Sequence, residues 1–120
     1  MSYCYCDYEM PEFLREKMVT ARVAHRCCEC TSTILPSEQY ELVTGKWAGE
    51  MGVHKTCAEC VKLRDYVTAH VPCFCWAYEN LYEDATEILR EYCHHVPGMA
   101  MEAGRMLVNM RRRLMAREEE

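Results

Sequence analysis

Several features that would assign a protein to a familiar class are missing from this sequence. No apolar run approaches the roughly 18 residues that a membrane-spanning helix needs. The first residues, MSYCYCDYEMPEF, lack the basic start and the apolar run of a secretory signal. Phe occurs only twice, against eight Tyr and nine Met, which predicts a soft and adaptable core. We therefore expect a cytoplasmic protein without a membrane segment.

Cysteine, in contrast, is present in excess. Ten of the 120 residues are Cys, a share that is typical of a disulfide scaffold or of metal sites. A reducing cytosol disfavours stable disulfides, so the expected compartment favours metal. The length and the 50% hydrophobic content predict one folded domain over residues 1–120.

Charge is unevenly distributed along the chain. The net charge is −5, yet residues 98–117 carry +4, whereas residues 1–97 carry −6 and residues 118–120 carry −3. An acidic body argues against general nucleic-acid binding, which depends on many phosphate contacts. The basic segment still offers a local patch for a partner. The candidate contact residues on it are Arg105, Arg111, Arg112 and Arg113.

The first half of the chain shows mainly strand patterns. Pro11 suits the first turn of a short helix over about residues 11–18. The segment from Val19 to Val23 then alternates apolar and polar residues, which predicts a strand. Residues 40–56 predict a β-hairpin that turns at Gly49.

The second half of the chain shows helical patterns. Apolar residues recur at helical spacing in three segments, and Pro72 and the Pro-Gly pair at 97–98 separate these segments. The expected helices are residues 57–70, 77–95 and 98–117.

Two Cys-x-x-Cys pairs carry the strongest signal. Zinc prefers four tetrahedral ligands, and thiolates suit it well. The second pair begins an expected helix, whose positive N-terminal end favours thiolate. Cys28 could compete with Cys27, but Cys28-x-Cys30 has the wrong spacing for a knuckle. His25 is a weaker substitute ligand. The expected ligands of this Zn²⁺ site are Cys27, Cys30, Cys57 and Cys60.

Two Cys-x-Cys motifs suggest a second metal site. In an extended segment both thiols of such a motif point the same way, so two motifs that meet would form a second Cys4 cluster. The alternative is that each motif is buried as a small hydrophobe. The residues concerned are Cys4, Cys6, Cys73 and Cys75. The chain is thus expected to bind one zinc ion, and two if these motifs meet.

The order of elements predicts an α+β fold. A knuckle, a β-hairpin and a helix that carries the second Cys pair form a treble-clef zinc core, expected over residues 19–70. Additional C-terminal helices over 76–117 either pack on that core or dimerise. The last helix has a Met-rich stripe that suits either core packing or a surface for a partner or a second copy. The stripe comprises Met99, Ala103, Met106, Met110 and Leu114.

The set of motifs AHRCCEC, IxPSEQYE, GKWxG, TCxxC and LRDYV resembles small zinc-finger-like proteins encoded by phages and prophages. The resemblance covers most of residues 1–80, including CYCDYEMPEF and VPCFCWA. It departs from the family at Ser37, where a glycine is usual. The resemblance implies a phage origin, a metal-stapled fold and the cytoplasm of a bacterial host. It implies no catalytic residues.

Three classes of function remain to be weighed. Catalysis is disfavoured, because the paired cysteines form closed sites and no phosphate-binding glycine loop or HExxH motif is present. Protein binding is favoured: small phage proteins often disable host complexes, anti-CRISPR proteins among them, and an acidic surface suits a basic groove on such a target. Trp47 near the hairpin tip is either an anchor for the partner or packs on the zinc knuckle. The alternative is a small nucleic-acid-binding regulator that uses the basic helix.

Overall fold

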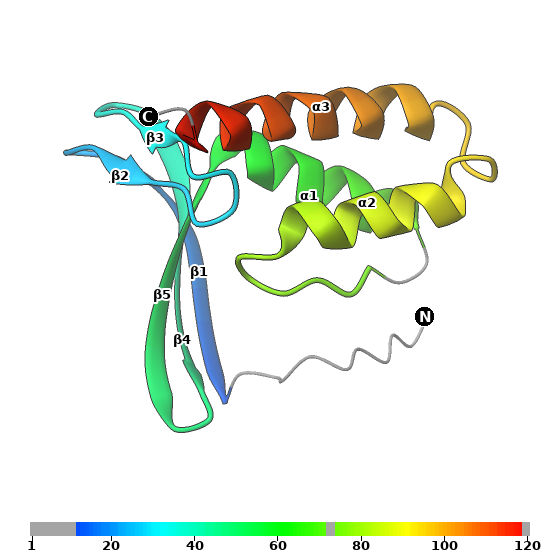
Figure 1. Ribbon diagram of the computed structural model, residues 1–120. Helices are drawn as coiled ribbons and strands as arrows, with labels where there is room; N and C mark the ends of the chain where they lie inside the picture. Colours follow the sequence, from blue (N-terminus) through cyan, green and yellow to red (C-terminus); the bar gives the residue numbers. More distant parts are fainter. Residues whose placement is uncertain (1–11, 72–73, 119–120) are drawn as a thin grey trace.

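The computed structural model describes residues 12–71 and 74–118 and shows an α+β fold. A three-stranded antiparallel sheet has the order β1-β4-β5, and β2 and β3 form a separate small ribbon. Three helices follow the strands in the chain (Figure 1). The strands are β1 (Phe13–Thr20), β2 (His25–Arg26), β3 (Thr33–Ile34), β4 (Gln39–Trp47) and β5 (Glu50–Cys57). The helices are α1 (Ala58–His70), α2 (Leu81–Tyr92) and α3 (Met99–Glu118).

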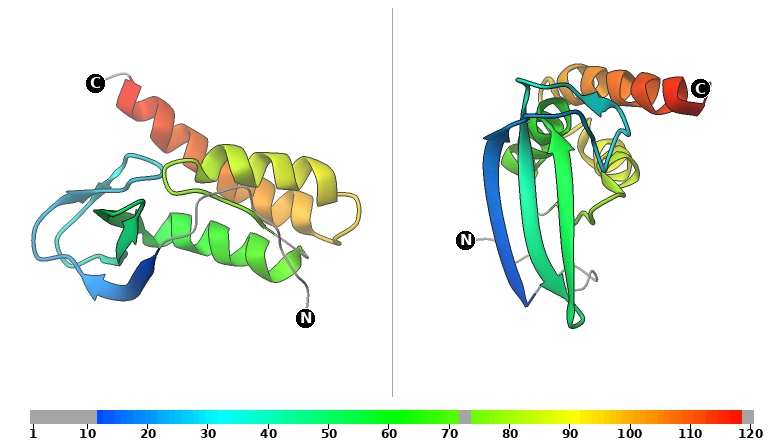
Figure 2. Two further views of the ribbon diagram at one scale, coloured as in Figure 1. Left: turned by 90° about the horizontal axis from the view of Figure 1, so that it is seen from below. Right: turned by 90° about the vertical axis from the view of Figure 1, so that its left-hand side faces the viewer.

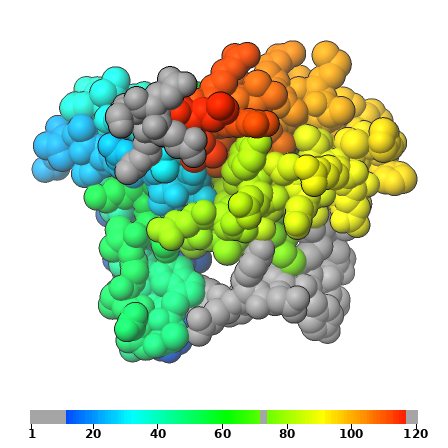
Figure 3. Space-filling model, in the orientation of Figure 1, coloured from blue at the N-terminus to red at the C-terminus, as the bar shows by residue number. Residues whose placement is uncertain are grey.

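The helices gather at one end of the sheet. α3 packs on both α1 and α2, and the hairpin end of β4 and β5 projects away from this helical layer (Figures 1 and 2). The space-filling view shows the same projection, with the sheet standing below the helices (Figure 3). The C-terminal end of α3 lies beside the β2–β3 ribbon. The fold thus brings the last helix next to the first Cys pair.

The β-hairpin forms as the sequence predicts. Ala48 and Gly49 have positive φ values of 51° and 82°, the conformation of a two-residue turn that matches the twist of paired strands. Trp47 then faces Glu50 across the hairpin. The three predicted helices are also confirmed, at somewhat different bounds.

The helix predicted after Pro11 is wrong for the described residues, and the strand predicted from Val19 to Val23 is confirmed only for Val19 and Thr20. Residues 13–18 belong to β1 and not to a helix, and the strand ends at Thr20. β1 pairs with β4 along its whole length, from Phe13 opposite Lys46 to Thr20 opposite Gln39. The backbone groups of β4 need a partner on this side, and this long-range pairing outweighs the weak local preference for a helix.

The core lies between the three helices and the near end of the sheet. The apolar face predicted for α2 is confirmed by its buried residues Leu81 and Ala85. The Met-rich stripe of α3 also faces inward, since Met99, Ala103 and Met110 are completely buried. Its remaining members, Met106 and Leu114, pack against the same core. The stripe therefore serves core packing within the chain.

A buried ion pair joins α1 to the sheet. Arg64 of α1 donates two hydrogen bonds to the carboxylate of Glu41 on β4, and both side chains are almost completely buried. The guanidinium also lies 5.0 Å from the ring centroid of Trp76, which precedes α2. These contacts hold the helix that carries the second Cys pair against the strand that leads into the hairpin.

Candidate metal centre

The first Cys pair lies in the turn between β2 and β3. The Cys27 amide donates to the Ser32 carbonyl at 2.9 Å, which closes the turn. The amides of Glu29 and Cys30 donate to Cys27 Sγ at 3.4 and 3.5 Å. Amides that point at sulfur stabilise a thiolate. The turn is therefore the zinc knuckle that the Cys-x-x-Cys spacing predicts.

The second Cys pair lies where β5 runs into α1. Cys57 is the N-cap residue of the helix, and Cys60 lies in its first turn. The Cys57 amide donates to Cys27 Sγ at 3.3 Å, so the two pairs already share a hydrogen bond. The partial positive charge of the helix N-terminus favours thiolate at both positions.

The four sulfur atoms form one compact cluster. All lie within 4.8 Å of one another, with 3.8 Å between Cys27 Sγ and Cys60 Sγ and 3.6 Å between Cys30 Sγ and Cys57 Sγ. A tetrahedral zinc ion with Zn–S bonds of about 2.3 Å requires sulfur atoms about 3.8 Å apart. None of the four is in a disulfide. The chain therefore has one Cys4 zinc site, as predicted.

The cluster is shielded from water and has four protein ligands. Cys27, Cys30 and Cys60 are at most 1% exposed, and Cys57 is partly buried. Thiols this close cannot all ionise without a cation. The hydrogen bond with Cys27 lowers the pKa of Cys30, whereas the contact with Cys27 raises the pKa of Cys60. Zinc removes this conflict by stabilising all four thiolates.

Arg113 of α3 lies in the immediate surroundings of the cluster. Its Nη2 donates to Cys60 Sγ at 3.7 Å, and the Ser32 hydroxyl is 2.9 Å from Cys30 Sγ. Four thiolates around Zn²⁺ leave a net charge of −2, so a nearby guanidinium offsets part of it. Arg113 thus differs from Arg105, Arg111 and Arg112, which are exposed on α3.

Glu29 links the knuckle to the helical layer. Its carboxylate is buried and accepts hydrogen bonds from the amides of Glu79 at 2.9 Å and Leu81 at 3.0 Å. These amides lie at the start of α2, where backbone N–H groups have no partner within the helix. A residue of the zinc knuckle therefore supplies the cap of a helix some 50 residues away in the chain. The one sequence feature that pointed to this role is the position of Glu29, a charged residue within the Cys27–Cys30 ligand pair.

Cys28 and His25 are not ligands. The Cys28 thiol lies 3.5 Å from the Thr56 hydroxyl and 3.5 Å from Glu29, away from the cluster. Burial raises the pKa of the Cys28 thiol to about 12, so it stays neutral at physiological pH. His25 Nδ1 lies 3.2 Å from Lys55 Nζ. The preference for Cys27, Cys30, Cys57 and Cys60 over these two residues is confirmed.

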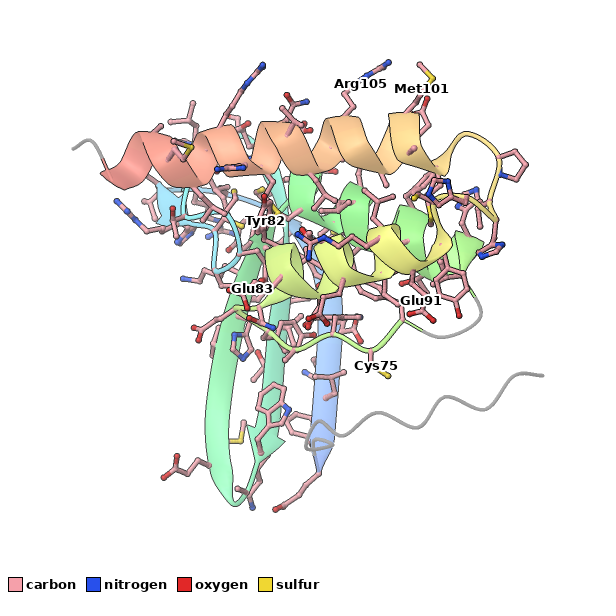
Figure 4. All side chains as sticks on the ribbon, turned by 45° about the vertical axis from the view of Figure 1, so that its right-hand side comes forward. Cys75, Tyr82, Glu83, Glu91, Met101 and Arg105 are labelled. Carbon is pink, nitrogen blue, oxygen red and sulfur yellow. The ribbon has the colours of Figure 1, made fainter. Side chains whose placement is uncertain are left out.

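The second predicted metal site lies largely outside the described residues. This applies to Cys4, Cys6 and Cys73. Cys75 is described and is partly buried, on the extended segment that leads into α2 (Figure 4). The second cluster stays a prediction.

Trp47 lies half-buried on the sheet and away from the zinc knuckle. Gly45 and Gly52 face each other across the hairpin, and a Cβ at either would lie within 3.2 Å of the indole. The ring edge also contacts His54 and Tyr78, with centroids 5.3 and 5.9 Å away. The indole therefore packs on the sheet itself, and a role in partner binding stays a prediction.

Comparison with known proteins gives no information about the function of the site. No family model, no curated protein and no solved structure matches the chain. Among the described residues, no helix has both the length and the apolar character needed to cross a membrane.

Proposed function

We propose that the protein is a non-enzymatic phage accessory protein that binds a host protein complex in the bacterial cytoplasm and inhibits it. The zinc site holds the knuckle, the hairpin and α1 in one rigid frame, which lowers the ordering cost of association. Inhibition of a host defence system, such as an anti-CRISPR activity, is the leading candidate within this class.

One observation carries the proposal: apolar side chains are exposed on the projecting sheet. Met51 and Val53 on β5 are 61% and 57% exposed, and β1 adds three more such residues. The strand register places Met51, Val53 and one β1 residue, Phe13, on one face of the sheet. The other two exposed β1 residues, Leu14 and Met18, lie on the opposite face. An exposed apolar patch on a rigid element marks a site of protein contact.

The charge of α2 supports binding to a basic target. Glu83, Glu87 and Glu91 are exposed and lie one turn apart, so they form an acidic row along the helix. Arg90 is the single cation of this helix. An acidic row of this kind complements a groove that normally binds nucleic acid, and the affinity should then fall with salt.

The absence of catalysis is supported by the chemistry of the zinc site. Four cysteine ligands leave no open position for a substrate or an activated water. Among the described residues, no other group of three or more His, Cys, Asp or Glu side chains could hold a metal ion.

A second candidate, nucleic-acid binding, is favoured by cations that lie on the same face of the sheet as Met51 and Val53. Residues directly opposite each other in an antiparallel sheet share a face. The register therefore places Arg15, Lys17, Lys46 and Lys55 together, while Glu16, Glu41 and Glu50 lie on the other face. Among the described residues, the only carboxylate in a salt bridge with these cations is Glu12, 3.7 Å from Lys46, and such an exposed pair contributes little to stability.

An affinity pull-down from a lysate of the bacterial host, with and without nuclease, tests the proposal. We expect a defined protein complex that survives nuclease. It should be lost with the Met51→Ser, Val53→Ser double variant and kept with the control Val23→Ser, Leu35→Ser, whose apolar residues are equally exposed but lie in loops. Recovery of nucleic acid alone, abolished by Arg15→Ala and Lys17→Ala, would instead establish the second candidate.

The anti-defence step has its own measurement. Plaque counts of a CRISPR-targeted phage should rise when the protein is expressed in a host with active CRISPR immunity. The Met51→Ser, Val53→Ser variant should lose this effect at equal protein level. Unchanged plaque counts with the wild-type protein would remove anti-CRISPR activity from the proposal and leave other host complexes as targets.

A further inference from the structure

The solvent side of α3 carries a regular row of exposed residues, here called the α3 seam: Met101, Arg105, Val108, Arg112 and Met115. Met101, Val108 and Met115 are 69%, 52% and 49% exposed. Figure 4 shows Met101 and Arg105 on the edge of α3 that points away from α1 and α2. The seam is thus distinct from the Met-rich stripe, which is buried on the other side of the same helix.

The spacing of the seam is that of a helix interface. Its three apolar residues recur every seven positions, or about 10.5 Å along the axis, and an arginine lies between each pair. A seven-residue apolar repeat keeps one face of a helix toward a second helix. Nothing in the packing of the described residues requires apolar side chains there, because α3 packs into the core with its opposite side.

The charge of α3 determines the kind of helix that fits. Arg105, Arg112 and the neighbouring Arg111 are exposed, and Glu102 is the single acidic side chain among those described on this helix. Cations beside an apolar seam select carboxylates on the partner. Resting on the proposed function, we propose that the α3 seam docks an acidic amphipathic helix of the target protein.

A second copy of this chain is a poor occupant. An antiparallel α3 pair centred on Val108 would place Met101 opposite Met115, but also Arg105 beside Arg111 of the other copy. Six arginines would then meet across a small interface against two Glu102 carboxylates. Like charges at such short range disfavour self-association.

A designed peptide tests the inference without knowledge of the target. The probe is a fluorescein-labelled 21-residue helix with Leu at heptad positions a and d, Glu at e and g, and Ala elsewhere. Its glutamates also suppress pairing of the peptide with itself. The comparison peptide has Lys at e and g. We expect the full-length, zinc-loaded protein to bind the Glu peptide at least tenfold more tightly than the Lys peptide at low ionic strength, by fluorescence anisotropy.

Variants of the seam assign the binding site. Val108→Glu should weaken binding of the Glu peptide at least tenfold. Arg105→Glu with Arg112→Glu should reverse the preference toward the Lys peptide, which a merely misfolded variant would not do. The control Arg22→Glu with Arg90→Glu changes the net charge equally at exposed sites away from the seam and should leave the preference unchanged. Zinc content and helical circular dichroism verify folding.

Three results would overturn the inference. The first is equal binding of both peptides, and the second is an unchanged preference in the variant with both arginines replaced. The third is a wild-type dimer in light scattering that Val108→Glu dissociates. This third result would assign the seam to a second copy of the chain. A target complex that is captured equally well by Val108→Glu would leave the proposed function intact and refute only the seam. Failure to capture any protein would instead count against the proposed function itself.

Discussion

Arg113 and Cys60 meet across the fold: Arg113 Nη2 on the last helix donates to Sγ of the zinc ligand on the first helix at 3.7 Å. This contact joins the metal centre to the C-terminal helix, as Glu29 joins it to the start of α2. The zinc site therefore organises all three helices as well as the knuckle. Loss of the metal should disturb the surfaces that α2 and α3 present.

We expect Cys60→Ser to remove zinc and unfold the core. A structural zinc site contributes on the order of 10 kcal/mol, which is comparable to the whole stability of a domain of this size. Zinc content by elemental analysis and helicity by circular dichroism measure both effects. The control is Cys93→Ser, a partly buried cysteine just after α2 that takes no part in the cluster. A folded Cys60→Ser protein without zinc would contradict the structural role of the site.

The number of zinc ions tests the second predicted cluster. Native mass spectrometry should find two zinc ions per wild-type chain and one in the Cys4→Ser, Cys6→Ser double variant. A single ion in both proteins would leave the Cys4 cluster of the described residues as the complete metal inventory.

Substitution of Arg113 should loosen the metal without removing it. Arg113→Met keeps most of the side-chain volume but loses the guanidinium, so the negative charge of the zinc–thiolate cluster is less well offset. Loss of a side chain that hydrogen-bonds a metal ligand typically costs on the order of tenfold in metal affinity. Competition with a chromogenic chelator should show this loss, and Arg113→Lys should recover part of the affinity. Arg112→Met, at an exposed position, is the matched control.

Glu29→Gln should destabilise the fold by about 1–3 kcal/mol, because an amide in place of the carboxylate cannot accept hydrogen bonds from both N–H groups at the start of α2, of which that of Leu81 is buried. Chemical denaturation in excess zinc measures the free energy of unfolding. Glu59→Gln on the exposed side of α1 serves as control and should be nearly neutral. Equal stability of the two variants would show that the Glu29 contacts carry little weight.

Glycines at two places should respond in opposite directions. A Cβ at Gly45 would lie 2.5 Å from Trp47 Cη2 and 3.0 Å from the Phe13 carbonyl, so Gly45→Ala should cost roughly 1–3 kcal/mol. Beyond the neighbouring backbone of α3 itself, no atom of the described residues lies within 4 Å of the Cβ position at Gly104, so Gly104→Ala should stabilise by about 0.5–1 kcal/mol. Thermal unfolding compares the two. A neutral Gly45→Ala would mean that the indole of Trp47 moves freely.

The pH dependence of alkylation tests the environment of Cys28. Its pKa is raised from 9.0 to about 12, so the fraction of thiolate in the folded protein should rise about tenfold per pH unit from pH 8 to 11. In the unfolded chain the same thiol is largely ionised above pH 9, and its rate should level off there. Iodoacetamide labelling followed by peptide mass spectrometry gives both profiles. A plateau near pH 9 in the folded, zinc-loaded protein would refute the burial effect.

The local parts of the fold could be predicted from the sequence. The spacing of Cys27, Cys30, Cys57 and Cys60 determined the ligand set, because zinc chemistry and the knuckle turn restrict it to few arrangements. The turn at Gly49 and the apolar face of α2 followed from backbone and side-chain periodicity within a few residues. Each of these features depends on neighbours close in the chain.

Contacts between distant segments were decided only by the tertiary structure. β1 is a strand because β4 offers an unpaired edge, although the residues after Pro11 tolerate a helix as well. Arg113 looked like its neighbours Arg111 and Arg112, and only the packing of α3 beside the knuckle separates it from them. The sequence by itself thus determined the metal, its four ligands in the knuckle and at the start of α1, the hairpin and the three helices. The folded chain decides which surfaces meet, and with them the partners of charged side chains and the face of α3 that stays exposed. Sequence periodicity does not predict these long-range contacts.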